Sequence, residues 1–272
     1  MSLENTVQER THELKSERAK LEKHNREMEH EVTLARNIQE QLIPAPNPTE
    51  YIYSLYRPMA KVGGDFYDFV FFENSDKIGI FISDVSGHGV PAAFITSMIK
   101  MTILQAGSRT ENPSALLLYL NEVLKNQTAG NFITAFYCIY DPEDNSIVYS
   151  NAGHPRPYLI SDNGVAQLHE SNNIALAVFP NNQLTKNNNS YVNLNATLPV
   201  NSKLLLYTDG FTETRPLHGS GYFEYSGMYD VLLKNSDLPC KFFTEKLLES
   251  IIEFRGSGSF EDDVCIVCLD VR

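Results

Sequence analysis

The 272-residue sequence has no tryptophan, no run of 18 uninterrupted apolar residues and no G-x-x-x-x-G-K-[ST] phosphate-binding loop. Because a membrane-spanning helix needs such an apolar run, we expect no membrane contact by this chain itself. The N-terminus also lacks the apolar core of a signal peptide. These absences predict a cytoplasmic protein, or the cytoplasmic part of a larger receptor, and they give no support to a P-loop nucleotide hydrolase.

Cysteine is scarce, with four residues at positions Cys138, Cys240, Cys265 and Cys268. The last two form a C-x-x-C pair, which is a spacing found in zinc and redox sites. However, the surrounding VCIVCLDV is typical of a strand, in which residues three apart point to opposite faces. We therefore predict small core residues in a reduced protein, with no catalytic cysteine.

Positive charge is also in short supply. Lys and Arg number 22 against 34 Asp and Glu, which gives a formal net charge of −12 at pH 7. Binding to nucleic acid without sequence preference requires cationic side chains that neutralise phosphates, so we expect no nucleic-acid partner. The remaining composition, 42% hydrophobic and 21% charged, is typical of a soluble globular protein.

Residues 3–43 contain neither glycine nor proline and are rich in Glu, Lys and Arg. Apolar side chains recur there every seven residues, at Val7, Leu14, Leu21, Met28, Ala35 and Leu42. The accompanying seam positions are mostly polar and are Thr11, Arg18, Asn25 and Val32. This spacing predicts a left-handed coiled coil, and we favour a parallel homodimer through this helix. The alternative is that the stripe packs against the chain's own globular domain.

Pro44 ends the predicted helix, and the texture of the sequence then changes to strands. The predicted domains are therefore an N-terminal coiled-coil helix over 1–43 and a globular domain over 44–272. We predict strands over 51–58, 66–72, 77–84, 131–140, 146–151, 156–161, 165–170, 203–208 and 263–271. We predict helices over 90–106, 113–126 and 239–254. The polar segment 181–190 is expected to be a mobile loop without a core-forming residue. Strands outnumber helices and often pair as hairpins, which favours an α+β sandwich over alternating βαβ units.

Acidic residues recur at the ends of the predicted strands. They are Asp65 and the Asp262-Asp263 pair at strand starts, and Asp84 and Asp209 at strand ends. A single Asp in such a place is more often a turn residue, but antiparallel sheets could bring all of these to one edge. Clustered carboxylates raise one another's pKa unless cations neutralise them. Oxygen ligands alone select Mg²⁺ or Mn²⁺ over zinc, and a pair of such ions is suited to phosphoryl chemistry.

Six segments, taken in order, carry a family resemblance: VGGDFYDF, ISDVSGHGVPAA, FITAFYCIYD, YSNAGHPRP, LLLYTDGFTETR and EDDVCIV. Together they resemble the PPM-type (type-2C) serine/threonine phosphatases, and most closely the bacterial SpoIIE-like branch that regulates sigma factors and stress responses. ARNIQEQLIP (35–44) resembles the helix that leads into that domain, so the resemblance covers about 35–272. It implies an α+β fold with two packed antiparallel β-sheets flanked by helices, an αββα sandwich, and a dinuclear Mn²⁺ or Mg²⁺ centre.

The resemblance also implies roles for individual residues. Asp84 would bridge both ions, with the Val85 carbonyl helping to hold one of them. Asp209 and Asp262 would bind the first ion, and Asp65 would complete the second, directly or through water. Asp84, Asp209 and Asp262 are thereby the residues expected to be essential for catalysis, in which a water activated by the two ions hydrolyses phosphoserine or phosphothreonine.

Other matching positions have less defined roles. Asp263 occupies a place next to Asp262 and ranks second to it as a metal ligand. His88 and His154 fall in matching motifs, where each is expected to form structural hydrogen bonds, with a general acid as the alternative. The sequence departs from the family at Cys265, where Thr is usual, at Asn201-Ser202, where Gly-Asp is common, and at NIALAVFP (173–180), which lacks the usual Gly. None of these changes removes a proposed ligand.

The resemblance predicts a phosphorylated bacterial signalling protein as the substrate, such as an anti-sigma-factor antagonist. Two other readings remain at this stage. One is a catalytically weak or inactive dimeric signalling module of the same fold, against which the intact acidic set argues. The other is a different two-metal hydrolase, of which a nuclease is disfavoured by the acidic chain. An upstream sensor domain in the native protein is a further expected partner.

Overall fold

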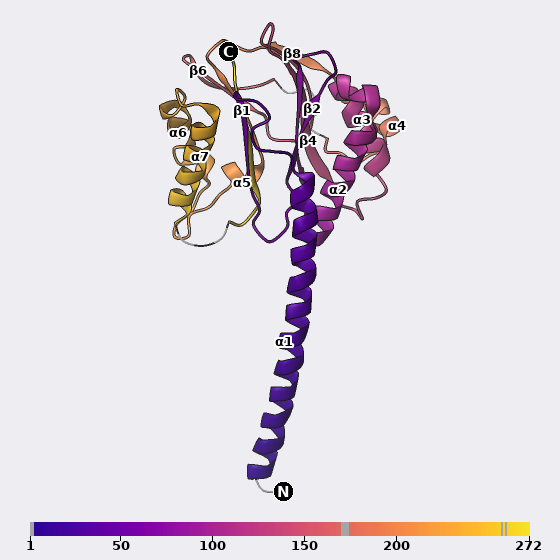
Figure 1. Cartoon of the computed structure of the whole chain (residues 1–272), viewed down its shortest axis with the longest axis vertical. Coiled ribbons are helices and arrows are strands. Elements are labelled where there is room, and N and C mark those ends of the chain that lie inside the picture. The colour runs from indigo at the N-terminus through magenta and orange to yellow at the C-terminus, as the bar shows by residue number, and fades with distance from the viewer. Residues whose placement is uncertain (1–2, 170–173, 257, 259) are drawn as a thin grey trace.

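Two five-stranded antiparallel sheets pack face to face, and helices cover both outer faces (Figure 1). The computed structural model describes residues 3–169, 174–256, 258 and 260–272, so residue 170 of one predicted strand and residues 257 and 259 of the loop before the last strand lie outside the described residues. The first sheet has the order β1 (Ile52–Arg57), β10 (Val264–Asp270), β9 (Lys203–Tyr207), β6 (Tyr158–Ser161) and β7 (Gly164–Gln167). The second has the order β2 (Phe66–Phe71), β3 (Ile78–Val85), β4 (Ile133–Asp141), β5 (Ser146–Ala152) and β8 (Leu194–Thr197). This architecture confirms the predicted sandwich.

The helices divide between the two outer faces. The second sheet is covered by α2 (Val90–Gln105), α3 (Pro113–Leu124) and the short α4 (Asn181–Lys186), whereas the first is covered by α6 (Met228–Lys234) and α7 (Cys240–Arg255) (Figure 1). The one-turn α5 (Asp209–Thr212) directly follows β9. Single turns of 3₁₀-helix occupy Gly107–Glu111 and Phe223–Tyr225. No helix within the described ranges is long and apolar enough to cross a bilayer.

Alternation along the strands creates three apolar layers, one between the sheets and one beneath the helices of each outer face. β10 shows the principle, since Cys265 lies in the layer between the sheets and Cys268 lies beneath α7. All four cysteines are buried and free, and burial raises the pKa of the Cys138 thiol to about 12. The C-x-x-C pair therefore does not share a site, as the strand pattern predicted.

The segment 181–190 was predicted to be a mobile polar loop without a core-forming residue, and that prediction was wrong for 181–186. Its first six residues form α4, and Leu184 is only 1% exposed in the apolar layer beneath α3. Asn181 accepts a hydrogen bond from Asn121 Nδ2 (2.7 Å) and donates one to the Leu118 carbonyl (2.9 Å). One apolar side chain and two hydrogen bonds to α3 thus stabilise a helix whose composition alone favours a loop.

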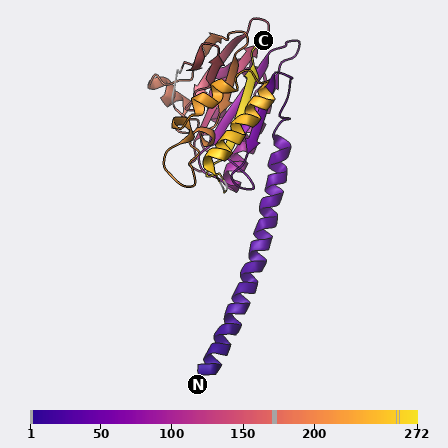
Figure 2. The same cartoon turned by 90° about the vertical axis from the view of Figure 1, so that its left-hand side faces the viewer.

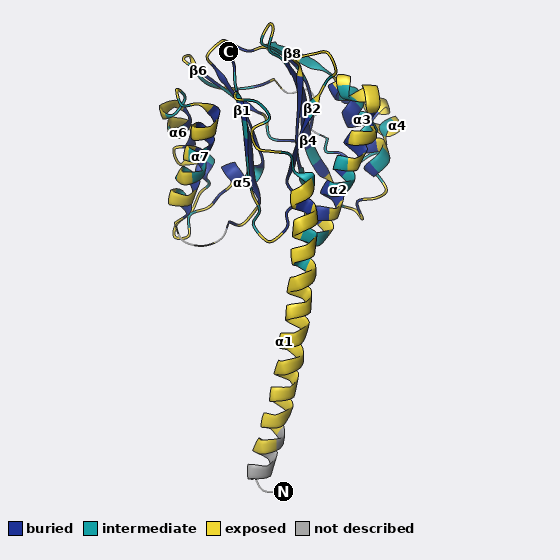
Figure 3. Cartoon of the chain, in the orientation of Figure 1, coloured by how far each residue is buried: buried dark blue, intermediate teal, exposed yellow. Residues whose placement is uncertain are grey.

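Helix α1 (Leu3–Leu42) extends away from the sandwich for most of its length (Figures 1 and 2). Val7, Leu14, Leu21 and Met28 are between 48% and 66% exposed, as the exposed surface of α1 in Figure 3 illustrates. These four positions do not pack against the chain's own domain, which removes the alternative for that part of the stripe. Among the described residues, α1 contacts the sandwich from Glu29 onward: Lys61 Nζ donates to the Glu29 carbonyl and to Thr33 Oγ1 (both 3.3 Å), and the turns from Leu34 to Gln39 pack against α2. The homodimer remains a prediction.

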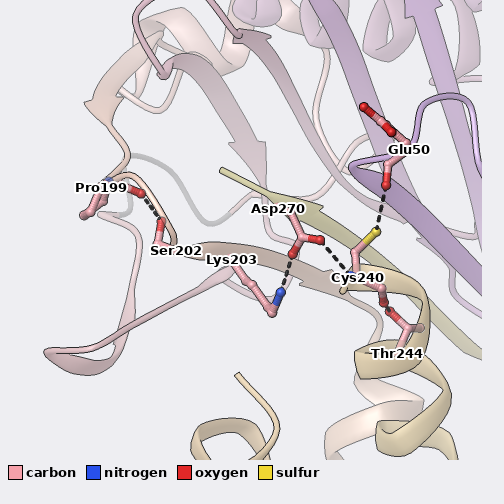
Figure 4. A network of polar contacts seen from close by, with 7 residues as sticks. All are labelled: Glu50, Pro199, Ser202, Lys203, Cys240, Thr244 and Asp270. Atoms are coloured by element: carbon pink, nitrogen blue, oxygen red, sulfur yellow. Dashed lines mark hydrogen bonds and ion pairs between the residues drawn. The ribbon is translucent and has the colours of Figure 1, made fainter. Parts of the chain in front are cut away.

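A buried ion pair ties α7 to the first sheet, at the end of β9 and β10 remote from Asp209 and Asp262 (Figure 4). The Lys203 ammonium, 6% exposed as a residue, contacts Asp270 Oδ1. The other carboxylate oxygen of Asp270 accepts the backbone N–H of Cys240 at the start of α7 (2.7 Å). The Phe243 ring lies 5.5 Å from the Lys203 ammonium. Asp270 therefore satisfies both a buried cation and a helix N-terminus.

Candidate metal centre

Strand order explains why the acidic residues meet. Antiparallel pairing places the end of β9, with Asp209, beside the start of β10, which Asp262 and Asp263 precede. In the other sheet the start of β2, preceded by Asp65, lies beside the end of β3, where Asp84 is the penultimate residue. The two edges face each other across the sandwich, because Thr208 Oγ1 donates a hydrogen bond to Asp65 Oδ2 (2.6 Å).

The carboxylates at this edge repel one another. Burial, followed by the charges of Asp209 and Asp262, raises the pKa of Asp84 to about 7. Burial and the Asp262 charge likewise raise the pKa of Asp209 to about 6. Asp65 is 2% exposed, and burial together with the Asp84 charge holds its pKa well above the ordinary value. Oxygen-only donors in mutual repulsion are chemically matched to hard divalent cations.

The side chains do not form a closed ligand set as they stand. Within the part of the chain that the structure describes, no three His, Cys, Asp or Glu side chains converge tightly enough to hold an ion. The donors at the edge are nevertheless the ones a dinuclear site requires, including the Val85 carbonyl, which lies against Gly64. The residues therefore fit Mn²⁺ or Mg²⁺ by donor chemistry and charge, and their roles as ligands stay a prediction.

Asp263 differs from its neighbour Asp262. It is 5% exposed, and its two oxygens accept the backbone N–H groups of Met59 (2.7 Å) and Gly64 (2.6 Å). Asp262 is exposed and accepts the N–H of Asp263 (2.8 Å) through Oδ1. The geometry favours Asp262 as the ligand of the pair, whereas Asp263 fixes the loop that carries Asp65.

Three glycines allow this close packing. A Cβ at Gly63 would lie 2.2 Å from Asp263 Oδ2, and one at Gly64 would lie 2.8 Å from the Val85 carbonyl oxygen. A Cβ at Gly210 would lie 1.9 Å from the Asp263 carbonyl oxygen. A side chain at Gly63 would displace the Asp263 carboxylate and the Tyr56 hydroxyl, and one at Gly64 or Gly210 would displace backbone. The Gly63-Gly64-Asp65 and Asp209-Gly210 motifs therefore reflect contact between the two strand edges.

The two histidines have different environments. His88 is exposed in the turn between β3 and α2. His154 is 3% exposed, with Nδ1 2.9 Å from Thr134 Oγ1, and its backbone N–H donates to Asn151 Oδ1 (2.8 Å). Burial lowers the pKa of His154 to about 3, so its ring is neutral near pH 7. A general acid near that pH would need the protonated imidazolium form. This favours the structural role for His154 over a general acid.

Sequence reasoning missed Gln39, which connects α1 to the acidic edge. Gln39 is 5% exposed; its Nε2 donates to the Gly63 carbonyl (2.8 Å) and its Oε1 accepts the Gly63 N–H (3.2 Å). Nε2 also lies 3.1 Å from Thr96 Oγ1 on α2. One amide therefore joins the end of α1, the loop that leads to Asp65, and α2. The available signal was only its place in ARNIQEQLIP, and no spacing rule distinguishes it from Gln41, the other glutamine there.

A groove of about 470 Å³ lies on the β3–β4 side of the acidic edge, lined by Lys125, Ala129, Phe132 and Ala177 among others. Phe132 is held to the turn after β3, because its N–H donates to Ser86 Oγ (2.9 Å) and its carbonyl accepts the Ser86 N–H (2.9 Å). Ala129 and Ala177 have positive φ values of 51° and 65°. An L-residue other than Gly or Asn pays a steric cost in this left-handed region. Ala177 lies in the NIALAVFP segment, for which the resemblance predicted a glycine.

Replacing Ala129 by glycine is expected to raise stability by about 0.5–1 kcal/mol, or about 1–3 °C in Tm, because it relieves the steric strain of the left-handed backbone. The methyl group that it removes is exposed, so its loss costs little packing. Ala177→Gly is the matched control. It relieves similar strain but removes a methyl group that is only 7% exposed, so the two effects offset each other. Thermal unfolding of both variants measures the difference. A lower Tm for Ala129→Gly would contradict the strain at this position.

Comparison with known proteins decides the family. A family model described as Stage II sporulation protein E (SpoIIE) matches residues 74–272. The chain belongs to the SpoIIE family. Phosphoserine phosphatase RsbU of Bacillus subtilis (strain 168) is 27% identical over 247 residues, covering 89% of this chain and 70% of RsbU. Phosphoserine phosphatase RsbP of the same organism is 28% identical over 249 residues, covering 89% of this chain but 58% of RsbP, so the chain spans little more than half of that relative.

The fold agrees with that of a solved relative. The SiaA-PP2C domain of Pseudomonas aeruginosa matches with a TM-score of 0.77 at 22% identity, covering 91% of this chain and 98% of that domain. These comparisons confirm the resemblance to the SpoIIE-like branch of PPM-type phosphatases and confirm the αββα sandwich. The SpoIIE-family match includes Asp84 in β3, Asp209 at the start of α5 and Asp262 just before β10, whereas Asp65 lies outside the matched residues.

Proposed function

We propose that this chain is a metal-dependent protein serine/threonine phosphatase that hydrolyses phosphoserine or phosphothreonine on a bacterial signalling protein, such as an anti-sigma-factor antagonist. Membership of the SpoIIE family and the similarity to two phosphoserine phosphatases support the reaction class. The observation that carries metal dependence is the carboxylate edge, where mutual repulsion and burial raise the pKa of Asp84 to about 7.

The proposed ligands divide between the two sheets. Asp84 would serve both of two Mn²⁺ or Mg²⁺ ions with help from the Val85 carbonyl, Asp209 and Asp262 would hold the first ion, and Asp65 would complete the second. When bound, the ions would supply positive charge for the phosphoryl oxygens and would lower the pKa of a water. The chain's own residues orient that site: Thr208 fixes the Asp65 carboxylate through its 2.6 Å hydrogen bond, and Asp263 fixes the backbone around Gly64.

Turnover of a phosphoserine peptide tests the proposal. We expect hydrolysis that requires Mn²⁺ or Mg²⁺ and stops with a chelator. A folded, metal-binding protein without turnover would instead indicate the signalling module of the same fold. Hydrolysis of nucleotide esters in preference to phosphopeptides would indicate a different two-metal hydrolase. Pull-down with the phosphorylated protein fraction would then identify the substrate.

We further propose that a parallel homodimer forms through α1 and that the native protein includes an upstream sensor domain. The heptad stripe supports the homodimer, because its apolar residues from Val7 to Met28 are exposed. The contact of Gln39 with both Gly63 and Thr96 supports coupling of the helix to the metal centre. Rotation of α1 about its axis would move this amide and thereby the loop to Asp65.

Insertions in α1 test the coupling. One, two or three residues inserted after Met28 rotate the N-terminal part of α1 relative to Gln39, whereas seven restore the heptad phase. We expect activity to change with phase by about 5- to 150-fold, which corresponds to about 1–3 kcal/mol of coupling, and to return at seven. Phosphopeptide turnover across the series, with dimer mass checked by light scattering, is the measurement. Activity that stays the same across the series, with the dimer intact, would show that α1 connects the domains without affecting the metal centre.

A further inference from the structure

One pocket at the acidic edge contains a positive charge. It has a volume of about 190 Å³ and is lined by Asp262 at the candidate metal centre and by Arg215 and Tyr222 beyond it. Glu213 and Glu261 also line it. Among the described residues that line this pocket, Arg215 is the one cation, and it follows the Asp209-Gly210 motif by only a few residues.

Arg215 is held from two directions. Its guanidinium carbon lies 4.9 Å from the centroid of the Tyr222 ring, and its Nη2 donates to the Tyr222 hydroxyl (2.6 Å). Its backbone carbonyl accepts Nη1 of Arg255 (3.3 Å), and Arg255 is only 9% exposed. Stacking on an aromatic face and an anchored backbone reduce the freedom that a long side chain loses on binding. The guanidinium is therefore oriented before any ligand arrives.

The local charge explains what this guanidinium can recognise. A phosphorylated substrate that approaches the edge meets the carboxylates of Asp262, Glu213 and Glu261, on a protein whose formal net charge is −12. A guanidinium has five N–H donors in a planar fork that matches the paired oxygens of phosphate and carboxylate. The hydrogen bond to the Tyr222 hydroxyl uses one nitrogen of that fork. The remaining donors of an exposed Arg215 are suited to an anionic ligand.

We propose that Arg215 is a specificity-determining residue that binds an anionic group of the phosphorylated substrate. That group is either the phosphoryl oxygens themselves or an acidic side chain beside the phosphorylated residue, which present the same oxygen chemistry to the fork. This inference rests on the proposed phosphatase function. Tyr222 acts as the positioning residue, because its ring and hydroxyl hold the guanidinium at the pocket.

Steady-state kinetics with Mn²⁺ test the inference in the full chain. Arg215→Gln is expected to raise KM for a phosphoserine peptide about 10- to 100-fold with kcat changed less than about twofold, since a hydrogen bond to a charged group is worth that much in binding. Arg215→Lys should raise KM less than Arg215→Gln does, because lysine keeps the positive charge but lacks the planar fork of N–H donors. Tyr222→Phe keeps the ring and should raise KM less than Arg215→Gln does. The KM of Arg215→Gln should also depend less on ionic strength.

Arg109→Gln is the matched control. Arg109 stacks on the ring of Tyr119 at 4.6 Å, lies on a 3₁₀ turn between α2 and α3, and is not among the residues that line the pocket. The substitution makes the same change in net charge and removes the same kind of contact. We expect its KM to match that of the wild type, so a rise in KM common to both variants would overturn the inference.

Three substrates separate the two sources of the anion. A raised KM for p-nitrophenyl phosphate as well as for peptides assigns Arg215 to the phosphoryl group. A raised KM only for peptides with Asp or Glu beside phosphoserine, and not for their alanine counterparts, assigns it to the flanking acid. Unchanged KM for all three in an active Arg215→Gln protein overturns the inference alone. Absence of metal-dependent turnover by the wild type would refute the proposed function, and this inference with it.

Discussion

Asp84→Asn is expected to lower phosphopeptide turnover by more than about 100-fold, since loss of even an outer partner of a metal ligand costs 10- to 100-fold. The same substitution should stabilise the metal-free protein. Burial and the charges of Asp209 and Asp262 raise the pKa of Asp84 from 3.8 to about 7, so its ionised form destabilises the native state. At neutral pH the relief is on the order of 2–4 kcal/mol at 1.36 kcal/mol per pKa unit. Thermal unfolding with a chelator and turnover with Mn²⁺ measure the two effects.

The sign of the pH dependence follows from the same shift. Between pH 3.8 and about 7 the native protein retains a proton on Asp84 that the unfolded chain has lost. This contribution therefore makes the metal-free wild type less stable as pH rises through that window, with no further change above it. Asp84→Asn should lack the contribution. Mn²⁺ should stabilise the wild type more at pH 7.5 than at pH 5.

Asp76→Asn provides the matched control for this first prediction. Asp76 is an exposed carboxylate in the turn between β2 and β3, so its replacement should alter neither turnover nor the stability of the metal-free protein. Isothermal titration with Mn²⁺ can contradict the prediction. Two Mn²⁺ sites with unaltered affinity in Asp84→Asn would remove Asp84 from its proposed bridging position.

Asp270→Ala is expected to destabilise the fold by about 3–5 kcal/mol, because it leaves the buried Lys203 ammonium without its carboxylate partner. It also removes the acceptor of the Cys240 N–H at the start of α7. Asp270→Asn retains an acceptor and should cost less. Denaturant unfolding measures the stability of the wild type, Asp270→Ala and Asp270→Asn. At denaturant concentrations below the unfolding transition kcat should be unchanged, since the ion pair lies at the opposite end of β9 from Asp209.

Two comparisons isolate the buried pair. Glu249→Ala breaks an exposed ion pair with Lys246 on α7 and should change stability by less than about 1 kcal/mol. The double variant Lys203→Met with Asp270→Asn removes both charges and should recover much of the loss. A cost for Asp270→Ala no larger than that for Glu249→Ala would show that water reaches the Lys203 ammonium.

Nine of the ten described strands, all except β8, and their acidic ends could be predicted because both depend on local patterns. Apolar runs that end in Asp before a glycine-containing turn, or that start after Gly-Gly, mark strand termini, and antiparallel pairing then brings those termini together. Asp84 and Asp209 were found in this way. The same local logic separated Cys265 from Cys268, since a strand fixes which face each residue occupies.

Features that depend on distant contacts could not be predicted. Gln39 is one glutamine among several polar residues on α1, and only its contact with Gly63 distinguishes it. Arg215 acquires a role because Tyr222 folds back onto it. Leu184 stabilises α4 by packing into the apolar layer beneath α3, although the polar residues around it favour a loop. In each case the decisive partner is far along the chain or supplied by tertiary packing.

The length of α1 determines which movements it can transmit. Forty residues at 1.5 Å each make a rod about 60 Å long, of which about 20 Å, from Glu29 to the end, lies where α1 contacts the sandwich. A sideways displacement of the free N-terminal part is reduced by these contacts before it reaches Gln39, and gentle bending of a long helix absorbs part of the rest. Rotation about the helix axis is passed on without such reduction. We therefore expect rotation of α1 to reach the contact with Gly63 more fully than tilt of α1 does.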